Sequence, residues 1–195
     1  MTTGVRVSVE GLDRLVPGRT YVFVSNHQSI YDIPILFWSL PYQLRIVAKE
    51  SLGNFPFLGW HLRRTGHMLV DRTRPARTAM FSWAASLTSR GLSLLVFPEG
   101  TRSRDGRVSA FKGGSFLLAL EAGLPVVPLS VVGSRHVMLK GRLATYPGHV
   151  RLVVHPPIET TAIGALGRRE FAARVHDIVA PAAESDVTDD VHGLA

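Results

Sequence analysis

Short runs of β-branched and apolar residues recur along the chain and alternate with more polar stretches. Runs of this length and composition are typical of buried β-strands. We therefore expect seven strands, over residues 5–9, 21–25, 44–48, 67–70, 93–97, 126–132 and 150–155.

Between several of these runs, apolar positions recur at helical spacing. The clearest case is 74–90, where they form one face before Gly91 ends the helix. Further helices are expected over 115–122 and 169–180, and over 31–40 in spite of Pro34.

Strands that alternate with helices predict an α/β fold with a mostly parallel sheet. The 195 residues suit one domain. We expect a single α/β domain over 1–183, with a mostly parallel mixed sheet of about seven strands flanked by helices. Residues 184–195 are acidic and are expected to form a disordered tail.

The charge of the chain is unevenly distributed. All 22 basic residues and eleven of the fifteen acidic residues lie within 1–183, so the net charge of +7 rises to +11 over this part. Such a body suits an anionic partner, either an acidic bilayer surface, a phosphorylated substrate or nucleic acid. A nucleic-acid-binding module would interleave aromatic residues with the cations, whereas here the aromatics lie mainly inside apolar runs. We therefore expect no nucleic-acid partner.

Two absences in the sequence narrow the chemistry and the location. The chain has no cysteine, which excludes disulfides, a thiol nucleophile and thiolate metal ligands. No apolar run approaches the roughly 18 residues of a membrane span. The protein is expected to be soluble or peripheral.

A histidine and an aspartate stand at the end of the second expected strand, in the segment NHQSIYD over 26–32. His27 is of a type that accepts a proton near neutral pH, and a carboxylate on its other nitrogen would fix the tautomer. In a continuous α-helix, residues five apart point about 140° away from each other. His27 and Asp32 can meet only if a turn separates them, with His27 in a loop and Asp32 in the first turn of a helix.

A second group of polar residues follows the strand at 93–97. The segment FPEGTRS over 97–103 offers the carboxylate of Glu99, the close backbone approach of Gly100, the hydroxyl of Thr101 and the guanidinium of Arg102. Arg72 follows another strand, and two arginines at strand ends could clamp one phosphate. Taken singly, these residues are equally consistent with a turn and a solvated surface.

These segments resemble the glycerophosphate and lysophosphatidate acyltransferase family. Asn26-His27 with Asp32 is similar to the family's catalytic motif. The segments 66–72, 97–103 and 127–129 are similar to its second, third and fourth blocks, in the same order. Leu69 replaces the usual phenylalanine of the second block, and the fourth block lacks the second proline of many members.

The resemblance implies an O-acyltransferase that moves a fatty acyl group to the free hydroxyl of 1-acylglycerol-3-phosphate, giving phosphatidic acid. His27 would be the general base and Asp32 its partner. The acceptor's phosphate would be held by six residues: Arg72, Glu99, Gly100, Thr101, Arg102 and Lys112. The resemblance implies no metal and no cofactor, with acyl-CoA or acyl carrier protein as the thioester co-substrate. The oxyanion donors are undetermined, with backbone N–H groups near His27 or Gly100 as candidates.

Attachment to lipid is expected through a segment of the domain itself. Only about twenty residues precede the first motif strand, whereas many members carry anchoring helices there. Residues 52–64 crowd aromatic and apolar side chains and end in Arg63 and Arg64, a combination that suits an anionic membrane surface. We expect a cytoplasmic protein, peripheral on the cytoplasmic face of a membrane.

Other functions stay open at this point. The acceptor could be another lysolipid or glycerol-3-phosphate. A hydrolase with Ser25 or Ser29 as nucleophile is disfavoured, because the chain has no Gly-x-Ser-x-Gly elbow. A lipid-binding domain without activity is disfavoured because both His27 and Asp32 are present.

Overall fold

The computed structural model describes residues 4–70, 77–138, 144–160 and 167–185. Its centre is a seven-stranded sheet with the order β1-β7-β6-β2-β5-β3-β4. The strands are β1 Val5–Glu10, β2 Val22–Ser25, β3 Leu44–Lys49, β4 Met68–Val70, β5 Ser93–Val96, β6 Val126–Val132 and β7 Gly148–Val154. All seven expected strands are confirmed, with bounds that differ by two residues or fewer.

The sheet is parallel except between β6 and β7, which run antiparallel. In its centre, Val24 of β2 is aligned with Val96 of β5 on one side and Pro128 of β6 on the other. The carboxyl ends of β2, β3, β4, β5 and β6 therefore share one edge of the sheet, which we call the carboxyl edge. Loops that leave neighbouring strands meet there.

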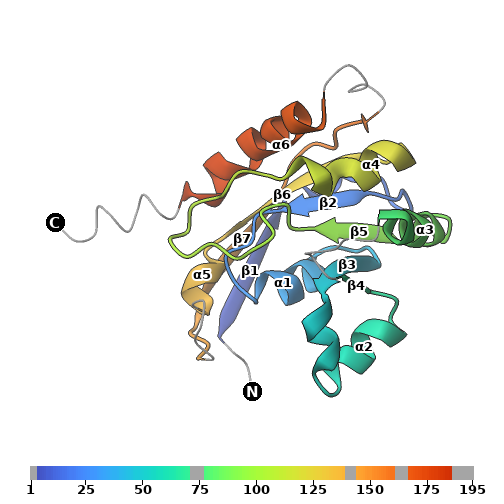
Figure 1. Cartoon of the computed structure of the whole chain (residues 1–195). Coiled ribbons are helices and arrows are strands. Elements are labelled where there is room, and N and C mark those ends of the chain that lie inside the picture. Colours follow the sequence, from blue (N-terminus) through green and yellow to red (C-terminus); the bar gives the residue numbers. More distant parts are fainter. Residues whose placement is uncertain (1–3, 71–76, 139–143, 161–166, 186–195) are drawn as a thin grey trace.

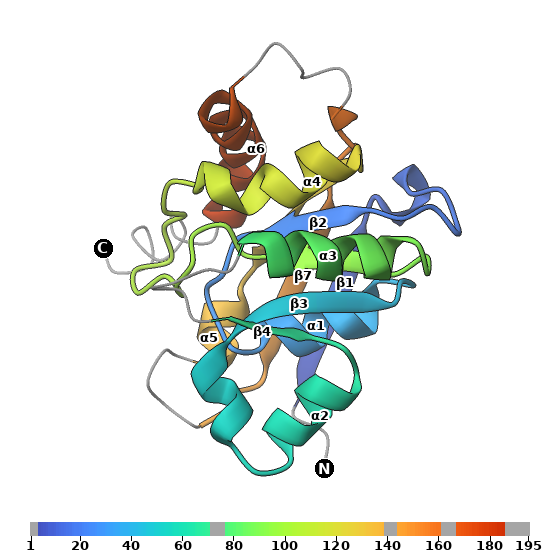
Figure 2. The same cartoon turned by 45° about the vertical axis from the view of Figure 1, so that its right-hand side comes forward.

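Helices cover both faces of the sheet (Figure 1). On one face lie α3 Arg77–Thr88, α4 Leu117–Ala122 and α6 Arg168–Ala183, and Figure 2 shows these layers from the side of α3. On the other face lie α1 Asp32–Ser39 and α5 Ser134–Val137. The 3-10 helix η2 Glu50–Asn54 and the helix α2 Leu58–Arg64 pack together beside β3 and β4.

Each face has its own hydrophobic core, as expected when a parallel sheet is covered on both sides. Phe116, Phe171 and Val175 are buried in the core under α3, α4 and α6. Phe23 of β2 and Leu36 of α1 are buried in the core of the other face. These cores fix the strands, and so the positions of the loops at the carboxyl edge.

The expected helices are confirmed with changes at their ends. The helix expected at 74–90 is α3, which ends at Thr88, and residues 74–76 lie outside the described part of the chain. The helix expected at 31–40 is α1, which begins at Asp32 and tolerates Pro34 because proline is compatible with a first turn. The helix expected at 115–122 is divided into the 3-10 helix η3 Gly113–Phe116 and α4. Helix α6 extends to Ala183 with Pro181 in its last turn.

Two residues of the expected disordered tail make defined contacts. Glu184 accepts a hydrogen bond from the backbone N–H of Val108 at 2.7 Å, and the Ser185 hydroxyl receives one from Arg151 at 3.2 Å. Residues 186–195 lie outside the described part of the chain. None of the helices in the described ranges is both long enough and apolar enough to cross a bilayer.

Candidate active site

The first and third motifs meet at the carboxyl edge. β2 ends at Ser25 and leads to His27, while its parallel neighbour β5 ends at Val96 and leads to the segment 97–103. The two loops are joined by a hydrogen bond from the backbone N–H of Ser103 to the carbonyl of His27 at 2.8 Å. Segments that lie about seventy residues apart in the sequence therefore form one site.

His27 and Asp32 form the expected pair. His27 Nδ1 lies 2.7 Å from Asp32 Oδ2, and Asp32 stands in the first turn of α1, as the spacing predicted. The same oxygen accepts the backbone N–H groups of Gln28 at 2.8 Å and Ser29 at 2.9 Å. The Asp32 side chain is fully buried, so this turn holds it rigidly against the imidazole.

The hydrogen bonds of Asp32 assign the tautomer of His27. An oxygen that accepts two N–H donors acts as an acceptor toward the ring as well, so the proton is assigned to Nδ1. Nε2 is then the nitrogen with a free lone pair, as a general base requires. The ring stacks on Phe97, with centroids 4.2 Å apart, and keeps 16% of its side chain exposed.

Glu99 takes a different place from the one expected. Its carboxylate accepts the backbone N–H of His27 at 2.8 Å with one oxygen and that of Ser109 at 2.9 Å with the other. Only 3% of the residue is exposed. Burial raises the pKa of Glu99, although these two backbone N–H groups act in the opposite direction. A buried carboxylate whose two oxygens both face the backbone positions the loops and does not present itself to an anionic phosphate.

The other residues expected at the phosphate lie on the same loop system. Gly100 has a φ of 76°, which favours glycine, and a Cβ there would lie 2.8 Å from Lys112 Nζ. The ammonium of Lys112 therefore lies directly against the Gly100 backbone. Thr101 is exposed and Arg102 is partly exposed. Arg72 lies outside the described residues, so its part in a phosphate clamp stays a prediction.

The backbone N–H groups considered as oxyanion donors are mostly occupied. Those of Gln28 and Ser29 donate to Asp32, and that of His27 donates to Glu99. The N–H of Gly100 donates to the carbonyl of Phe97 at 3.1 Å. These four groups serve to hold the loops, so an oxyanion donor has to be sought among other groups.

Sequence reasoning missed the residues that fasten the site to the rest of the domain. The amide of Asn26 pairs with both backbone groups of Val131, at 2.8 and 2.9 Å, and so ties the His27 loop to β6. The Gln28 amide donates to the carbonyls of Gly106 at 2.8 Å and Ala183 at 3.2 Å. No sequence signal distinguishes such amides from surface ones, because their partners are backbone groups of distant segments.

Within residues 4–70, 77–138, 144–160 and 167–185, no three His, Cys, Asp or Glu side chains lie close enough to hold a metal ion. A reaction that needs no metal and no cofactor stays a prediction. The groups that the described site does offer are a partly exposed imidazole base, a buried carboxylate behind it, and cations on the neighbouring loop.

The fold and this site define a class of protein: an α/β domain with a His–Asp pair after one strand and a basic loop after its parallel neighbour. A model of the Acyltransferase family matches residues 6–132, which is more than half of the chain. The chain belongs to the acyltransferase family.

Individual relatives agree with this assignment. The chain is 35% identical over 156 residues, 78% of its length, to a chloroplastic 1-acyl-sn-glycerol-3-phosphate acyltransferase of Arabidopsis thaliana, and covers 44% of that protein. It is 33% identical over 162 residues, 82% of its length, to the human 1-acyl-sn-glycerol-3-phosphate acyltransferase alpha, and covers 57% of that protein. The chain thus spans about half the length of these relatives.

The fold also matches a solved structure. The crystal structure of PlsC, the 1-acyl-sn-glycerophosphate (LPA) acyltransferase of Thermotoga maritima, aligns with a TM-score of 0.80 and 33% identity. The alignment covers 92% of the present chain and 71% of the other. The seven-stranded, mostly parallel sheet flanked by helices is therefore a shared architecture.

Proposed function

We propose that the chain is an O-acyltransferase that moves a fatty acyl group from a thioester to the free hydroxyl of 1-acylglycerol-3-phosphate, giving phosphatidic acid. The observation that carries the proposal is the 2.7 Å contact between His27 Nδ1 and Asp32 Oδ2, which leaves the Nε2 lone pair of a partly exposed ring to act as the base. The names of the curated relatives support lysophosphatidate as the acceptor.

In the proposed reaction, His27 Nε2 takes the proton of the acceptor's hydroxyl while the oxygen attacks the thioester carbonyl. A carbon–oxygen bond forms and a tetrahedral oxyanion results. When this intermediate collapses, the carbon–sulfur bond breaks and the thiolate leaves with the proton that His27 carried. Asp32 stabilises the imidazolium between the two steps, because its carboxylate faces Nδ1.

The loop beside His27 supplies the groups that would hold the acceptor's phosphate. The ammonium of Lys112 and the partly exposed backbone turn at Gly100 lie together, and the hydroxyl of Thr101 and guanidinium of Arg102 follow in sequence. Cations that hold the phosphate also orient the hydroxyl of the same molecule. This orientation lowers the entropic part of the activation barrier. Arg72, which follows β4 in the sequence and lies outside the described residues, is the further cation of this proposal.

A hydrolase with a serine nucleophile receives no support from the site. The Ser25 hydroxyl donates to the carbonyl of Asn26 at 2.9 Å, and the Ser29 hydroxyl donates to that of Met138 at 2.8 Å. Both residues are fully buried. A hydroxyl that donates to a backbone carbonyl cannot at the same time give its proton to His27.

Acyl-CoA and acyl carrier protein are both compatible donors, and other lysolipids or glycerol-3-phosphate are the alternative acceptors. The proposed acceptor resides in a bilayer, so we also propose that the enzyme works at an anionic membrane surface. Its positive charge and the absence of a spanning helix among the described residues are compatible with peripheral attachment. Attachment at a cytoplasmic face, and the lack of a nucleic-acid partner, stay predictions.

The proposal is tested by thiol release from acyl-CoA and from acyl carrier protein thioester, each with and without lysophosphatidate. We expect release that depends on the acceptor, together with phosphatidate identified by mass spectrometry. Thiol release at the same rate without acceptor would identify a thioesterase. Thiol release that depends on glycerol-3-phosphate and not on lysophosphatidate would identify glycerol-3-phosphate as the acceptor.

A further inference from the structure

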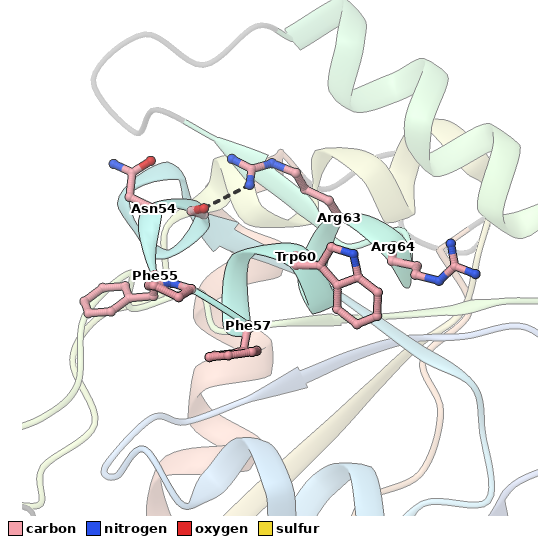
Figure 3. A pocket seen from close by; sticks show the side chains of 8 residues that line it. Asn54, Phe55, Phe57, Trp60, Arg63 and Arg64 are labelled. Atoms are coloured by element: carbon pink, nitrogen blue, oxygen red, sulfur yellow. Dashed lines mark hydrogen bonds between the residues drawn. The ribbon is translucent and has the colours of Figure 1, made fainter.

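Three large aromatic side chains stand in solvent around the turn between η2 and α2. Phe57 is 86% exposed, Trp60 65% and Phe55 58%. Figure 3 shows them spread around this turn, on the rim of an open hollow lined also by Asn54, Arg63 and Arg64. Isolated exposed apolar side chains are ordinary, but three aromatic rings within six residues are not.

The segment is held rigidly by its own backbone contacts. A Cβ at Gly59 would overlap the carbonyl of Gly53, so only glycine permits α2 to approach η2 this closely. The Gly59 N–H donates to the carbonyl of Phe55 at 2.8 Å, and Arg63 Nη1 donates to that of Gly53 at 2.9 Å (Figure 3). The exposed rings are therefore held in place by the close packing of α2 on η2.

The backbone at Phe57 is strained, although its ring is exposed. Its φ of 63° with ψ of −53° makes it the one non-glycine residue with positive φ in the described ranges. Such a conformation costs of order 1–3 kcal/mol for a residue with a side chain, and residues of this kind cluster at functional sites. A phenylalanine that is both strained and exposed gains nothing from the fold, which points to a gain in contact with a partner.

The charge of the same segment favours an anionic partner. No acidic residue occurs between Ser51 and Arg64. The guanidinium of Arg64 lies 5.8 Å from the centre of the Trp60 ring. A tryptophan beside an arginine suits the headgroup boundary of a bilayer, where the indole enters the apolar side and the cation faces lipid phosphates.

The position of the segment connects it to the active site. η2 begins directly after β3, at the carboxyl edge, and β5 alone separates β3 from β2 in the sheet. His27 follows β2 at this same edge. A bilayer that touches the turn between η2 and α2 therefore lies toward the same edge of the sheet as His27.

We propose that Phe55, Phe57, Trp60 and Arg64 form the surface by which the enzyme docks on an anionic phospholipid bilayer. This inference rests on the proposed acyl transfer to a lipid acceptor. It narrows the segment 52–64 expected from the sequence, because Leu62 is 5% exposed and Leu52 packs against the core below α1, so neither reaches lipid. Arg63 is turned toward Gly53 and serves the scaffold.

The binding test is co-sedimentation with vesicles of phosphatidylcholine alone and with added phosphatidylglycerol. We expect the wild type to pellet with the anionic vesicles, and the double variant Phe57→Gly with Trp60→Ser to bind about tenfold or more weakly. Arg64→Glu should weaken binding to anionic vesicles by about tenfold and to neutral ones little. Phe57→Gly alone should unfold at the same or a higher temperature, since glycine relieves the positive φ.

Matched controls come from other parts of the molecule. Arg174→Glu makes the same charge change on an exposed residue of α6, which packs against β6, away from β3 and β4 in the sheet. Val16→Ser removes an exposed apolar group that precedes β2, at the edge away from the site. Both should pellet like the wild type.

Activity with two forms of the acceptor separates docking from chemistry. The double variant should match the wild type with a short-chain lysophosphatidate kept monomeric in solution, and should lose activity with the same headgroup embedded in vesicles. If the wild type is inactive on both acceptors, the proposed function is wrong. The sedimentation test of docking is independent of this result, because binding to vesicles needs no catalysis. Docking is overturned if the wild type stays in the supernatant or if the folded double variant pellets like it. If instead the wild type is a dimer, the double variant is a monomer, and both pellet equally with vesicles, this surface is an interface between two copies of the chain.

Discussion

Glu99 Oε1 accepts the backbone N–H of His27 at 2.8 Å, so a buried carboxylate from the third motif fixes the backbone of the proposed general base in the first. The other oxygen holds Ser109, farther along the same loop. Glu99 thus connects the two loops of the site by hydrogen bonds to the backbone of each. Its position accounts for a carboxylate within an otherwise basic segment that is expected to bind phosphate.

Glu99→Gln tests this positioning role. A glutamine amide would replace one accepting oxygen with an N–H₂ group that faces another N–H donor. We expect a loss of about 1–3 kcal/mol in unfolding free energy and a lower kcat, with a small change in the acceptor's KM. Urea unfolding and steady-state kinetics measure these quantities. A large rise in the acceptor's KM with unchanged stability would instead place Glu99 at the substrate.

Asp32→Asn tests the charge behind His27. Because one oxygen of Asp32 accepts all three hydrogen bonds, an asparagine oxygen in its place would keep the N–H donors satisfied and remove the negative charge. We expect kcat to fall by about 10²-fold or more with the substrates' KM values little changed. Normal kcat in a folded Asp32→Asn protein would show that the imidazolium needs no carboxylate.

Arg102→Ala and Lys112→Ala test the phosphate site, and Arg72→Ala tests the sequence-based part of it. A cation that binds the acceptor's phosphate before and during the reaction affects acceptor binding most. We expect each variant to raise the acceptor's KM by about tenfold or more and to leave the donor's KM nearly unchanged. Arg107→Ala, an exposed change on the same loop, is the control. Equal effects on the KM values of both substrates would indicate that these residues also contact the acyl donor.

His67 gives a prediction of stability against pH. Burial, with the nearby Arg45 and His61, lowers the pKa of His67 from 6.5 to about 4. Its Nδ1 accepts the backbone N–H of Ile46 at 3.1 Å. As the pH falls below about 6.5, the unfolded chain takes up a proton that the folded chain refuses until about 4. The stability that neutral His67 contributes is therefore present above pH 6.5 and is lost toward pH 4.

His67→Asn is the matched variant, because the asparagine oxygen can accept the Ile46 N–H without titrating. Urea unfolding between pH 4 and 7.5 should show a shallower loss of unfolding free energy in the variant than in the wild type. Equal slopes would exclude His67 as a source of the acid sensitivity.

Much of the fold followed from local pattern. The strand 126–132 was found with its observed bounds, and the start of α1 followed from the requirement that His27 and Asp32 meet across a turn. The bounds of this strand and the start of this helix are both determined by residues close together in the sequence, so the sequence pattern is sufficient to predict them.

The remaining features depend on contacts between distant segments. The inward turn of Glu99 and the bonds from Gln28 to Gly106 and Ala183 depend on backbone groups whose positions only the folded chain fixes. The sequence therefore suggested candidate reactive residues more readily than the residues that hold them in place.

The central claim is that His27 removes the acceptor's proton during acyl transfer. It is tested most directly by phosphatidate formation from lysophosphatidate and an acyl thioester, measured by mass spectrometry for wild type and His27→Ala at equal concentrations of folded protein. His149→Ala, which removes an exposed imidazole elsewhere, is the control. The account predicts a loss of about 10³-fold or more in His27→Ala and near-normal rates in the control. Near-normal phosphatidate formation by folded His27→Ala would contradict it.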